Sequence, residues 1–251
     1  MGHLLAEGEV KNTYGTGSFI LMNIGNKPKI SELGLLTTLL YNSNKSPKEP
    51  IYALEGAIET AGVVVNWLKN NMKFFSNYKE LETLYESVNS SGGVFFVPAF
   101  SGLYSPHWDN TASGTIFGLS MQTQKGHFIR AAYEAISFRT TEVIENLEKD
   151  AKIKIKALKV DGGLSESVHF LQTQADILNK DVIRQKEKEI TIIGSAIAAG
   201  LEKSTNIWES ANEISKLLKF DKTFSSELNN DERINLRKKW DKAVSRAKNW
   251  H

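Results

Sequence analysis

The sequence of 251 residues contains no cysteine, which excludes disulfides, zinc–thiolate sites and thiol nucleophiles. Charge of one sign is also lacking, because 31 Lys and Arg side chains nearly balance 29 Asp and Glu side chains and leave a net charge of +2. This balance argues against a general binder of nucleic acids or membrane surfaces. Long apolar runs are absent too: residues 60–68 and 190–201 fall short of the roughly 20 residues needed to cross a bilayer.

The N-terminus has no basic segment followed by an apolar run, so we expect no signal peptide and a cytoplasmic protein. Residues 1–10 are expected to be partly disordered or an artificial addition left by cloning. The five histidines do not pair at metal-ligand spacing, so no metal site is expected in the chain. The length and the 41% hydrophobic content fit one large domain or two small ones.

Two glycine-bearing segments, residues 12–19 (NTYGTGSF) and 160–165 (VDGGLS), are the most informative features present. Glycine lets the backbone turn with positive φ and approach a ligand closely. Backbone amides freed in such turns form concave anion sites. The pair therefore suggests a nucleotide held at both ends, with its phosphates on one loop and its nucleoside on the other.

Each segment also has a purely structural interpretation. The turn at residues 15–18 is equally well explained as an ordinary β-hairpin tip. The turn at residues 161–163 could place an anion at a helix N-terminus or bring a nucleoside against glycine Cα atoms. It could also be a tight turn with Ser165 as the cap of the following helix.

The hydrophobic pattern predicts an antiparallel meander followed by an α/β arrangement. Strands are expected over residues 18–23, 35–41, 51–56, 94–100, 157–160 and 181–184. Helices are expected over residues 58–70, 126–149, 166–178, 191–202 and 231–250, the last within a C-terminal stretch at 229–251. Residues 101–113 form an irregular segment, in which Asp109 is more simply explained as a turn former than as a catalytic carboxylate.

Other nucleotide-binding motifs are missing from the sequence. Residues 56–62 lack the Lys-Ser/Thr of a P-loop, and no G-x-G-x-x-G opens a helix after a strand. The catalytic and metal-binding elements of protein kinases are absent as well. Any nucleotide must therefore be held by another architecture.

Several collinear stretches resemble the glycerol kinases of the FGGY carbohydrate kinase family. They are residues 11–19 (KNTYGTGSF), 52–62 (YALEGAIETAG), 97–119 (VPAFSGLYSPHWDNTASGTIFGL) and 159–178 (KVDGGLSESVHFLQTQADIL). Residues 114–134 match the family's second signature, and residues 240–250 are similar to the end of glycerol kinases. The resemblance covers the chain from about residue 7 onward. It implies the α/β fold of actin-like, ribonuclease-H-like ATPases, a mixed sheet flanked by helices.

The resemblance also implies roles for individual residues. It assigns the nucleotide to Gly15, Thr16, Gly17, Gly62, Asn66, Gly162, Gly163 and Ser167, and the wall of the glycerol pocket to Phe19. Asn66 stands where bacterial relatives have glutamine, and Ser167 stands where they have asparagine. The implied ligands are ATP or ADP with Mg²⁺, and glycerol. The implied reaction transfers the γ-phosphoryl group to a terminal hydroxyl and gives sn-glycerol 3-phosphate.

The resemblance covers only the C-terminal half of such an enzyme, so residues 1–251 are expected to form one C-terminal kinase domain. The proton-accepting aspartate of the family is expected upstream of Met1, in the absent N-terminal domain, and Glu7 does not replace it. We therefore predict no catalytic residue in this chain and no kinase activity for the fragment alone. Expected partners are the N-terminal domain and further copies of the protein, with no nucleic acid and no membrane. The alternatives are a domain of another polyol or sugar kinase, or a noncatalytic binding or oligomerisation module.

Overall fold

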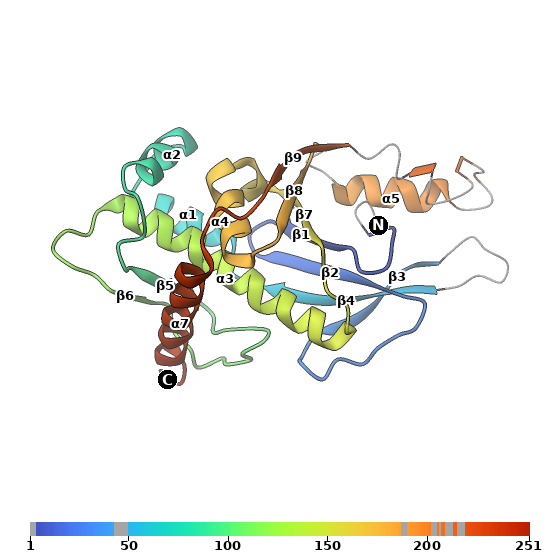
Figure 1. The fold of residues 1–251 in the computed structure, drawn as a ribbon, viewed down its shortest axis with the longest axis horizontal. Helices are drawn as coiled ribbons and strands as arrows, with labels where there is room; N and C mark the ends of the chain where they lie inside the picture. The colour runs from blue at the N-terminus through green and yellow to red at the C-terminus, as the bar shows by residue number, and fades with distance from the viewer. Residues whose placement is uncertain are drawn as a thin grey trace.

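The computed structural model describes residues 4–42, 50–186, 190–201, 205, 207–208, 213–214 and 219–251 (Figure 1). In this part of the chain, a seven-stranded sheet is flanked by helices, and a two-stranded sheet lies apart from it. This is the α/β class that the sequence predicts. No helix in these ranges is both long enough and apolar enough to cross a membrane.

The large sheet is mixed. In sheet order, its strands are β3 (Leu36–Asn42), β4 (Pro50–Ile58), β2 (Ser18–Gly25), β1 (Val10–Tyr14), β7 (Ala157–Gly162), β8 (Asp181–Gln185) and β9 (Phe220–Phe224). Strand β1 is antiparallel to β2 and parallel to β7. The expected meander is wrong in its order, because β4 lies between β2 and β3. The more apolar β4 buries Ala53 and Leu54, whereas β3 takes the exposed edge.

The remaining elements surround this sheet. They are α1 (Gly62–Asn70), α2 (Tyr78–Glu86), β5 (Phe95–Val97), β6 (Thr115–Phe117), α3 (Lys125–Ala151), the 3₁₀ helix η1 (Gly163–Glu166), α4 (Val168–Leu178), α5 (Ile190–Gly200) and α7 (Asn230–Ala247). The helix expected from residue 58 begins only at Gly62, because Ile58 is buried in β4 and pairs with Ser18. The strands and helices expected from the sequence did not include β1, α2, β6, β9 or the 3₁₀ helix η1.

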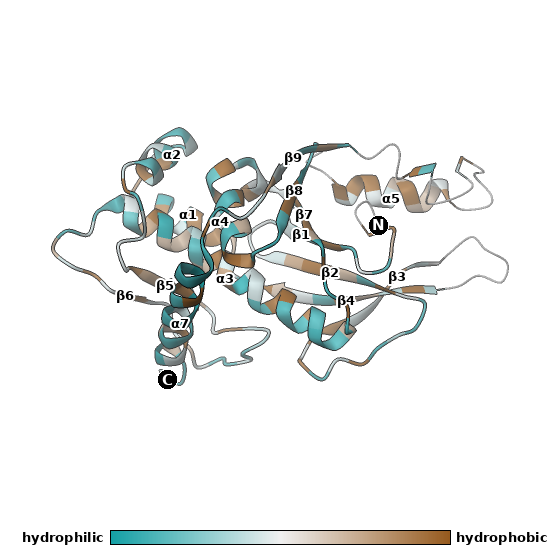
Figure 2. Cartoon of the chain, viewed as in Figure 1, coloured by the Kyte–Doolittle hydropathy of each residue, from teal (hydrophilic) through white to brown (hydrophobic). Residues whose placement is uncertain are grey.

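Helix α3 covers one face of the sheet and organises the main core. Val10, Asn12 and Tyr14 are buried on this face, alternating with less buried residues along β1. A Cβ on Gly56 of β4 would lie 2.3 Å from Val143 of α3, so this glycine allows the helix to pack closely on the sheet. Figure 2 shows hydrophobic residues along the strands, whereas α7 is largely hydrophilic on its outer side.

A second core cluster joins α7 to α3 and β5. Trp240 of α7 is 1% exposed and stacks on Phe138 of α3 with ring centroids 5.1 Å apart. Ala243 and Ala247 are buried in the same cluster, and Leu236 packs against it. These residues form the apolar face of α7, which packs against the rest of the domain.

A buried polar network fixes the irregular segment at residues 101–113 to α3 and α7. The Glu142 carboxylate accepts hydrogen bonds from Arg139 at 2.6 Å and from Trp240 Nε1 at 2.7 Å, and it lies 3.0 Å from His107 Nε2. Arg139 also donates to the Ser105 carbonyl at 2.8 Å. Burial opposes the charged form of Glu142, but the bonds from His107 and the charge of Arg139 outweigh it and lower its pKa to about 2.

Candidate nucleotide site

The β1–β2 hairpin ends in Gly15-Thr16-Gly17, the first of the two predicted glycine turns. The Gly15 amide donates to the Gly17 carbonyl at 2.8 Å and closes the turn. Thr16 is exposed at the tip. In the described part of the chain, neither the Thr16 amide nor the Gly17 amide takes part in a backbone hydrogen bond. Two amides and one hydroxyl are therefore available to an anion at the tip.

The start of α1 packs directly on this hairpin. The Gly62 amide donates to the Gly15 carbonyl at 3.0 Å, and the Val63 amide donates to the Thr16 carbonyl at 2.9 Å. A Cβ on Gly62 would lie 2.4 Å from the Gly15 carbonyl oxygen, so only glycine allows this approach. The first amides of α1 therefore hold the hairpin in position, and the free donors of the site are on the hairpin itself.

The second predicted turn, Asp161-Gly162-Gly163, lies beside the hairpin. Gly162 is the partner of Tyr14 in the parallel β1–β7 pair, one residue before the hairpin tip begins. Its φ is +88°, and a Cβ there would lie 2.3 Å from the Tyr14 carbonyl oxygen. Both glycine turns thus lie side by side, at the carboxyl ends of the neighbouring inner strands β1 and β7.

The arrangement can be compared with known proteins. Residues 10–202 match the model of the C-terminal domain of the FGGY family of carbohydrate kinases. The chain belongs to this family. The match includes both glycine turns, the hairpin and α3.

Curated relatives of this FGGY domain include glycerol kinases. The glycerol kinase of Corynebacterium kroppenstedtii is 43% identical over 243 residues, which are 97% of this chain and 47% of that protein. Glycerol kinase 2 of Thermotoga maritima is 44% identical over 243 residues, 97% of this chain and 48% of that protein. The chain thus spans about half the length of the curated relatives that it matches.

Solved structures agree with this assignment. The crystal structure of Plasmodium falciparum glycerol kinase with ADP superposes with a TM-score of 0.89 at 39% identity, over 98% of this chain and 48% of that chain. A gluconate kinase from Lactobacillus acidophilus superposes with a TM-score of 0.77 at 22% identity, over 94% of this chain and 46% of that chain, a likeness that shows the fold alone. The actin-like, ribonuclease-H-like fold expected from the sequence is confirmed.

In this FGGY domain, Gly163 offers an open surface next to Gly162. No atom lies within 4 Å of a Cβ built on Gly163, and the residue is exposed. The 3₁₀ helix η1 separates this turn from α4. Close approach of a nucleoside to the glycine therefore fits the geometry better than an anion at the N-terminus of α4.

Ser167 caps α4, so the alternative interpretation in which Ser165 caps the helix is wrong. The Ser167 hydroxyl accepts from the Phe170 amide at 3.2 Å, whereas the Ser165 hydroxyl donates to the Gly162 carbonyl at 2.6 Å. The reason is that η1 displaces the start of the α-helix by two residues.

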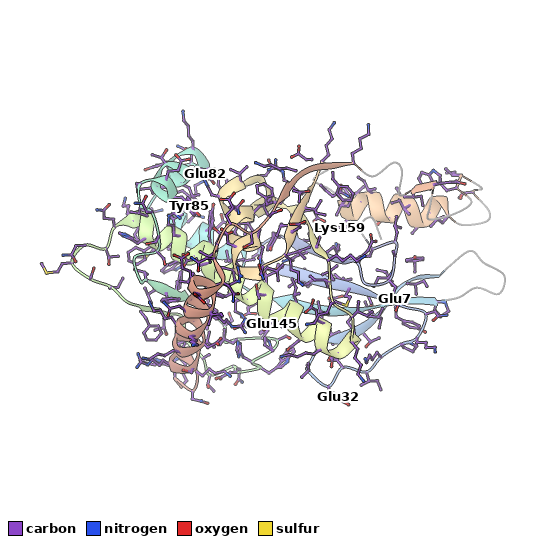
Figure 3. The ribbon with its side chains drawn as sticks, viewed as in Figure 1. Glu7, Glu32, Glu82, Tyr85, Glu145 and Lys159 are labelled. Carbon is purple, nitrogen blue, oxygen red and sulfur yellow. The ribbon has the colours of Figure 1, made fainter. Side chains whose placement is uncertain are left out.

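The Ser167 hydroxyl also connects α4 to α2. It donates to the Glu82 carboxylate at 2.7 Å, and the Tyr85 hydroxyl of α2 lies 3.1 Å from the Thr173 hydroxyl of α4. Figure 3 labels Glu82 and Tyr85, which both lie on α2. Sequence reasoning missed Glu82, although Asn77 and Glu80 carry the Asx-x-x-Glu signature of a helix start. The proton of the Ser167 hydroxyl is therefore already used within the protein.

The other two predicted site residues lie close to the hairpin in sequence or in register. Asn66 is exposed on α1, one helical turn after Gly62. Phe19 is 54% exposed on β2 and pairs with Thr13 and Ala57. Its neighbours along β2 are buried under α3, so Phe19 is on the opposite face of the sheet.

Glu59 is an acidic residue next to the hairpin tip that sequence reasoning did not single out. It follows β4, and a Cβ on Gly17 would lie 3.1 Å from the Glu59 carbonyl oxygen. Burial raises the pKa of its carboxyl, although its own backbone amide and Arg139 oppose the shift. No pattern marked this residue, because residues 58–70 read as one helix.

Asp109 is a turn former in this structure. Its Oδ1 accepts from the amide of Thr111 at 2.9 Å, from the Thr111 hydroxyl at 2.6 Å and from the amide of Ala112 at 3.1 Å. No group of three or more His, Asp or Glu side chains that could hold a metal is found among the described residues. We therefore assign no reaction step to a metal bound by this chain alone.

Proposed function

We propose that this chain is the nucleotide-binding half of an ATP-dependent glycerol kinase, which transfers the γ-phosphoryl group of ATP to glycerol and forms sn-glycerol 3-phosphate. The observation that carries the proposal is the pairing of Tyr14 with Gly162, which puts both glycine turns side by side at the carboxyl ends of β1 and β7. Glycerol is preferred over other polyols because relatives named glycerol kinase are 42–44% identical to this chain.

The phosphate end of the nucleotide is assigned to the hairpin. The free amides of Thr16 and Gly17 and the Thr16 hydroxyl are donors of the kind that stabilise phosphate oxygens. Gly15 and Gly62 hold the tip in place through their mutual hydrogen bond. Phosphoryl transfer depends mainly on such positioning and on neutralising charge, so a rigid hairpin suits the reaction.

The nucleoside end is assigned to the turn after β7. Gly162 fixes the turn against β1, and the bare surface of Gly163 allows a flat group to approach the backbone. Asn66 and Ser167 are proposed as polar neighbours of the base and ribose. Because the Ser167 proton is donated to Glu82, Ser167 would act towards the ligand as an acceptor.

The alcohol site and the proton acceptor are mostly outside these 251 residues in this proposal. Phe19 supplies one apolar wall for glycerol. Mg²⁺ would accompany the nucleotide phosphates and reduce their negative charge, with ligands from the N-terminal domain. The partner domain would complete the cleft, and the whole enzyme would work in the cytoplasm as an oligomer.

The isolated chain should accordingly be inactive. A coupled assay for ADP release should show no glycerol-dependent turnover with the 251-residue protein, and activity should emerge when the N-terminal domain is present in the same chain. Measurable phosphorylation of glycerol by these 251 residues alone would refute the assignment of the proton acceptor to the other domain.

Two other functions make different predictions. A kinase for another polyol would show a higher kcat/KM for that polyol than for glycerol when the full-length enzyme is tested on a panel. A noncatalytic oligomerisation module would use exposed apolar residues such as Leu36 and Leu39 on the edge strand β3. Light scattering would then show a mass that rises with protein concentration, without any nucleotide binding.

A further inference from the structure

A slot of about 230 Å³ lies between the two-stranded sheet and α7. One wall contains Phe95 and Phe117, which are direct partners in the β5–β6 pair. Ala243 of α7, which is buried in the second core cluster, also lines it. None of the predicted nucleotide or glycerol residues lines this slot. Its lining is therefore largely apolar and aromatic.

Three cations of α7 form the other side of the slot. Lys239, Lys242 and Arg246 all line it and are exposed. Their spacing of three and four residues places them along one side of the helix. In the described ranges, none of the three forms an ion pair or a side-chain hydrogen bond. Three positive charges thus meet at one apolar slot without a counter-charge.

The segments that contain β5 and β6 supply no acid that could neutralise them. Residues 87–99, which lead into β5, contain no Asp or Glu, and residues 111–124, which contain β6, contain none either. The local charge therefore differs from the near-neutral balance of the whole chain. A basic patch with low-dielectric walls attracts anions.

The opposite side of α7 shows that free cations are not a general property of this helix. Arg237 is paired with Glu145 at 2.9 Å and with Asp241 at 2.8 Å. Arg233 donates to the carbonyls of Asp176 and Leu228. The helix thus pairs its arginines on one side and leaves its cations unpaired beside the slot.

We propose that this slot binds a small anion that joins a phosphate or carboxylate group to a planar apolar ring. The ring would pack on the half-buried Phe117, beside the buried Phe95, since aromatic faces favour such contacts. The anionic group would lie among the three cations, where Arg246 can offer a two-pronged contact. The size of the slot suits one ring and no more. This site is independent of the proposed kinase function.

Phenyl phosphate is the probe that tests this proposal. In a ¹H–¹⁵N NMR titration of the 251-residue chain, it should shift the amides of Gly93 and Gly118, which line the slot. The Gly162 and Gly163 amides should not move. Inorganic phosphate should bind at least about fivefold more weakly than phenyl phosphate, because it lacks the ring. Phenol should bind more weakly than phenyl phosphate, because it lacks the charge.

Matched variants separate the slot from ordinary surface charge. Arg246→Ala should weaken binding about tenfold, as expected for loss of a charge-assisted contact. Lys238→Ala removes an exposed cation next to Lys239 that lines a different pocket and not the slot, and it should change affinity less than about twofold. Unchanged far-UV spectra would show that both variants fold.

The proposal is overturned by any of three results: no shift at Gly93 or Gly118 at about 10 mM probe, equal affinity for inorganic phosphate, or equal weakening by Lys238→Ala and Arg246→Ala. Failure of the kinase proposal would instead show in the glycine turns and would leave these results unchanged.

Discussion

Gly162 is the position where one methyl group should do the most damage. Its φ of +88° and ψ of −179° fall in a region that is essentially restricted to glycine. An alanine there costs about 1–3 kcal/mol in backbone strain alone. Its Cβ would also lie 2.3 Å from the Tyr14 carbonyl oxygen and 2.9 Å from the Tyr14 nitrogen, so the β1–β7 pair would have to separate.

We therefore expect Gly162→Ala to lower the free energy of unfolding by about 3 kcal/mol, the strain plus part of the lost strand pairing. For a domain of this size, the unfolding temperature should fall by roughly 6–12 °C. Urea unfolding followed by circular dichroism measures the change directly, with the slope of the transition kept as a check on two-state behaviour.

The neighbouring glycine provides the control. A Cβ on Gly163 meets no atom within 4 Å, and its φ is not positive. Gly163→Ala should therefore leave stability unchanged or raise it by about 0.4–1 kcal/mol through the unfolded state. The same methyl group would stand on the surface proposed for the nucleoside, so ADP affinity should fall. If Gly162→Ala unfolds at the wild-type urea concentration, the described packing of β7 on β1 is wrong.

Three further predictions concern buried charge and the alcohol site. Glu142→Gln should cost about 3–5 kcal/mol at pH 7, because Arg139 stays buried without a counter-charge. The wild type should lose stability in urea titrations as the pH falls from 4.5 to about 2, the window set by the lowered pKa of Glu142. The variant should not show this loss. Burial raises the pKa of Glu134 from 4.5 to about 7, so the wild type loses stability as the pH rises from 4.5 through 7. Glu134→Gln should therefore leave the free energy of unfolding unchanged at pH 4 and raise it by roughly 2–3 kcal/mol at pH 8. Equal stability of both proteins at pH 8 would contradict this. Phe19→Ala should change stability by less than about 1 kcal/mol but raise KM for glycerol in the two-domain enzyme; an unchanged KM would remove Phe19 from the alcohol site.

The sequence predicts the long elements of this fold well. The helix expected over residues 126–149 is α3 at Lys125–Ala151, and the helix expected over 231–250 is α7 at Asn230–Ala247. Both have enough turns for the 3.6-residue period to stand out. The short elements were missed for the opposite reason. Strand β6 has three residues, and β9 buries only Phe224, so neither shows a clear pattern.

The order of strands was not predictable from local patterns. The sequence shows three β-prone stretches in a row, and the simplest arrangement makes each a neighbour of the next. The structure instead inserts β4 between β2 and β3, where Leu54 is buried, and leaves Leu36 exposed at the edge. Whether a strand has neighbours on both sides is decided by tertiary packing, and the local spacing of apolar residues does not encode it.

The glycine turns were found from sequence because glycine marks special backbone positions. What the sequence could not distinguish was which glycine fixes the turn and which offers an open surface. Gly62 and Gly162 are held by carbonyls of the hairpin region, whereas Gly163 is open. The link from Ser167 to Glu82 was also hidden, because it joins residues 85 positions apart.

The most direct test of a shared nucleotide site is an ADP titration of the isolated chain followed by ¹H–¹⁵N NMR. The account predicts that the amides of Gly17 and Gly163 shift together and saturate with the same dissociation constant, because one molecule touches both turns. Shifts confined to one of these glycines, or two different dissociation constants, would contradict it.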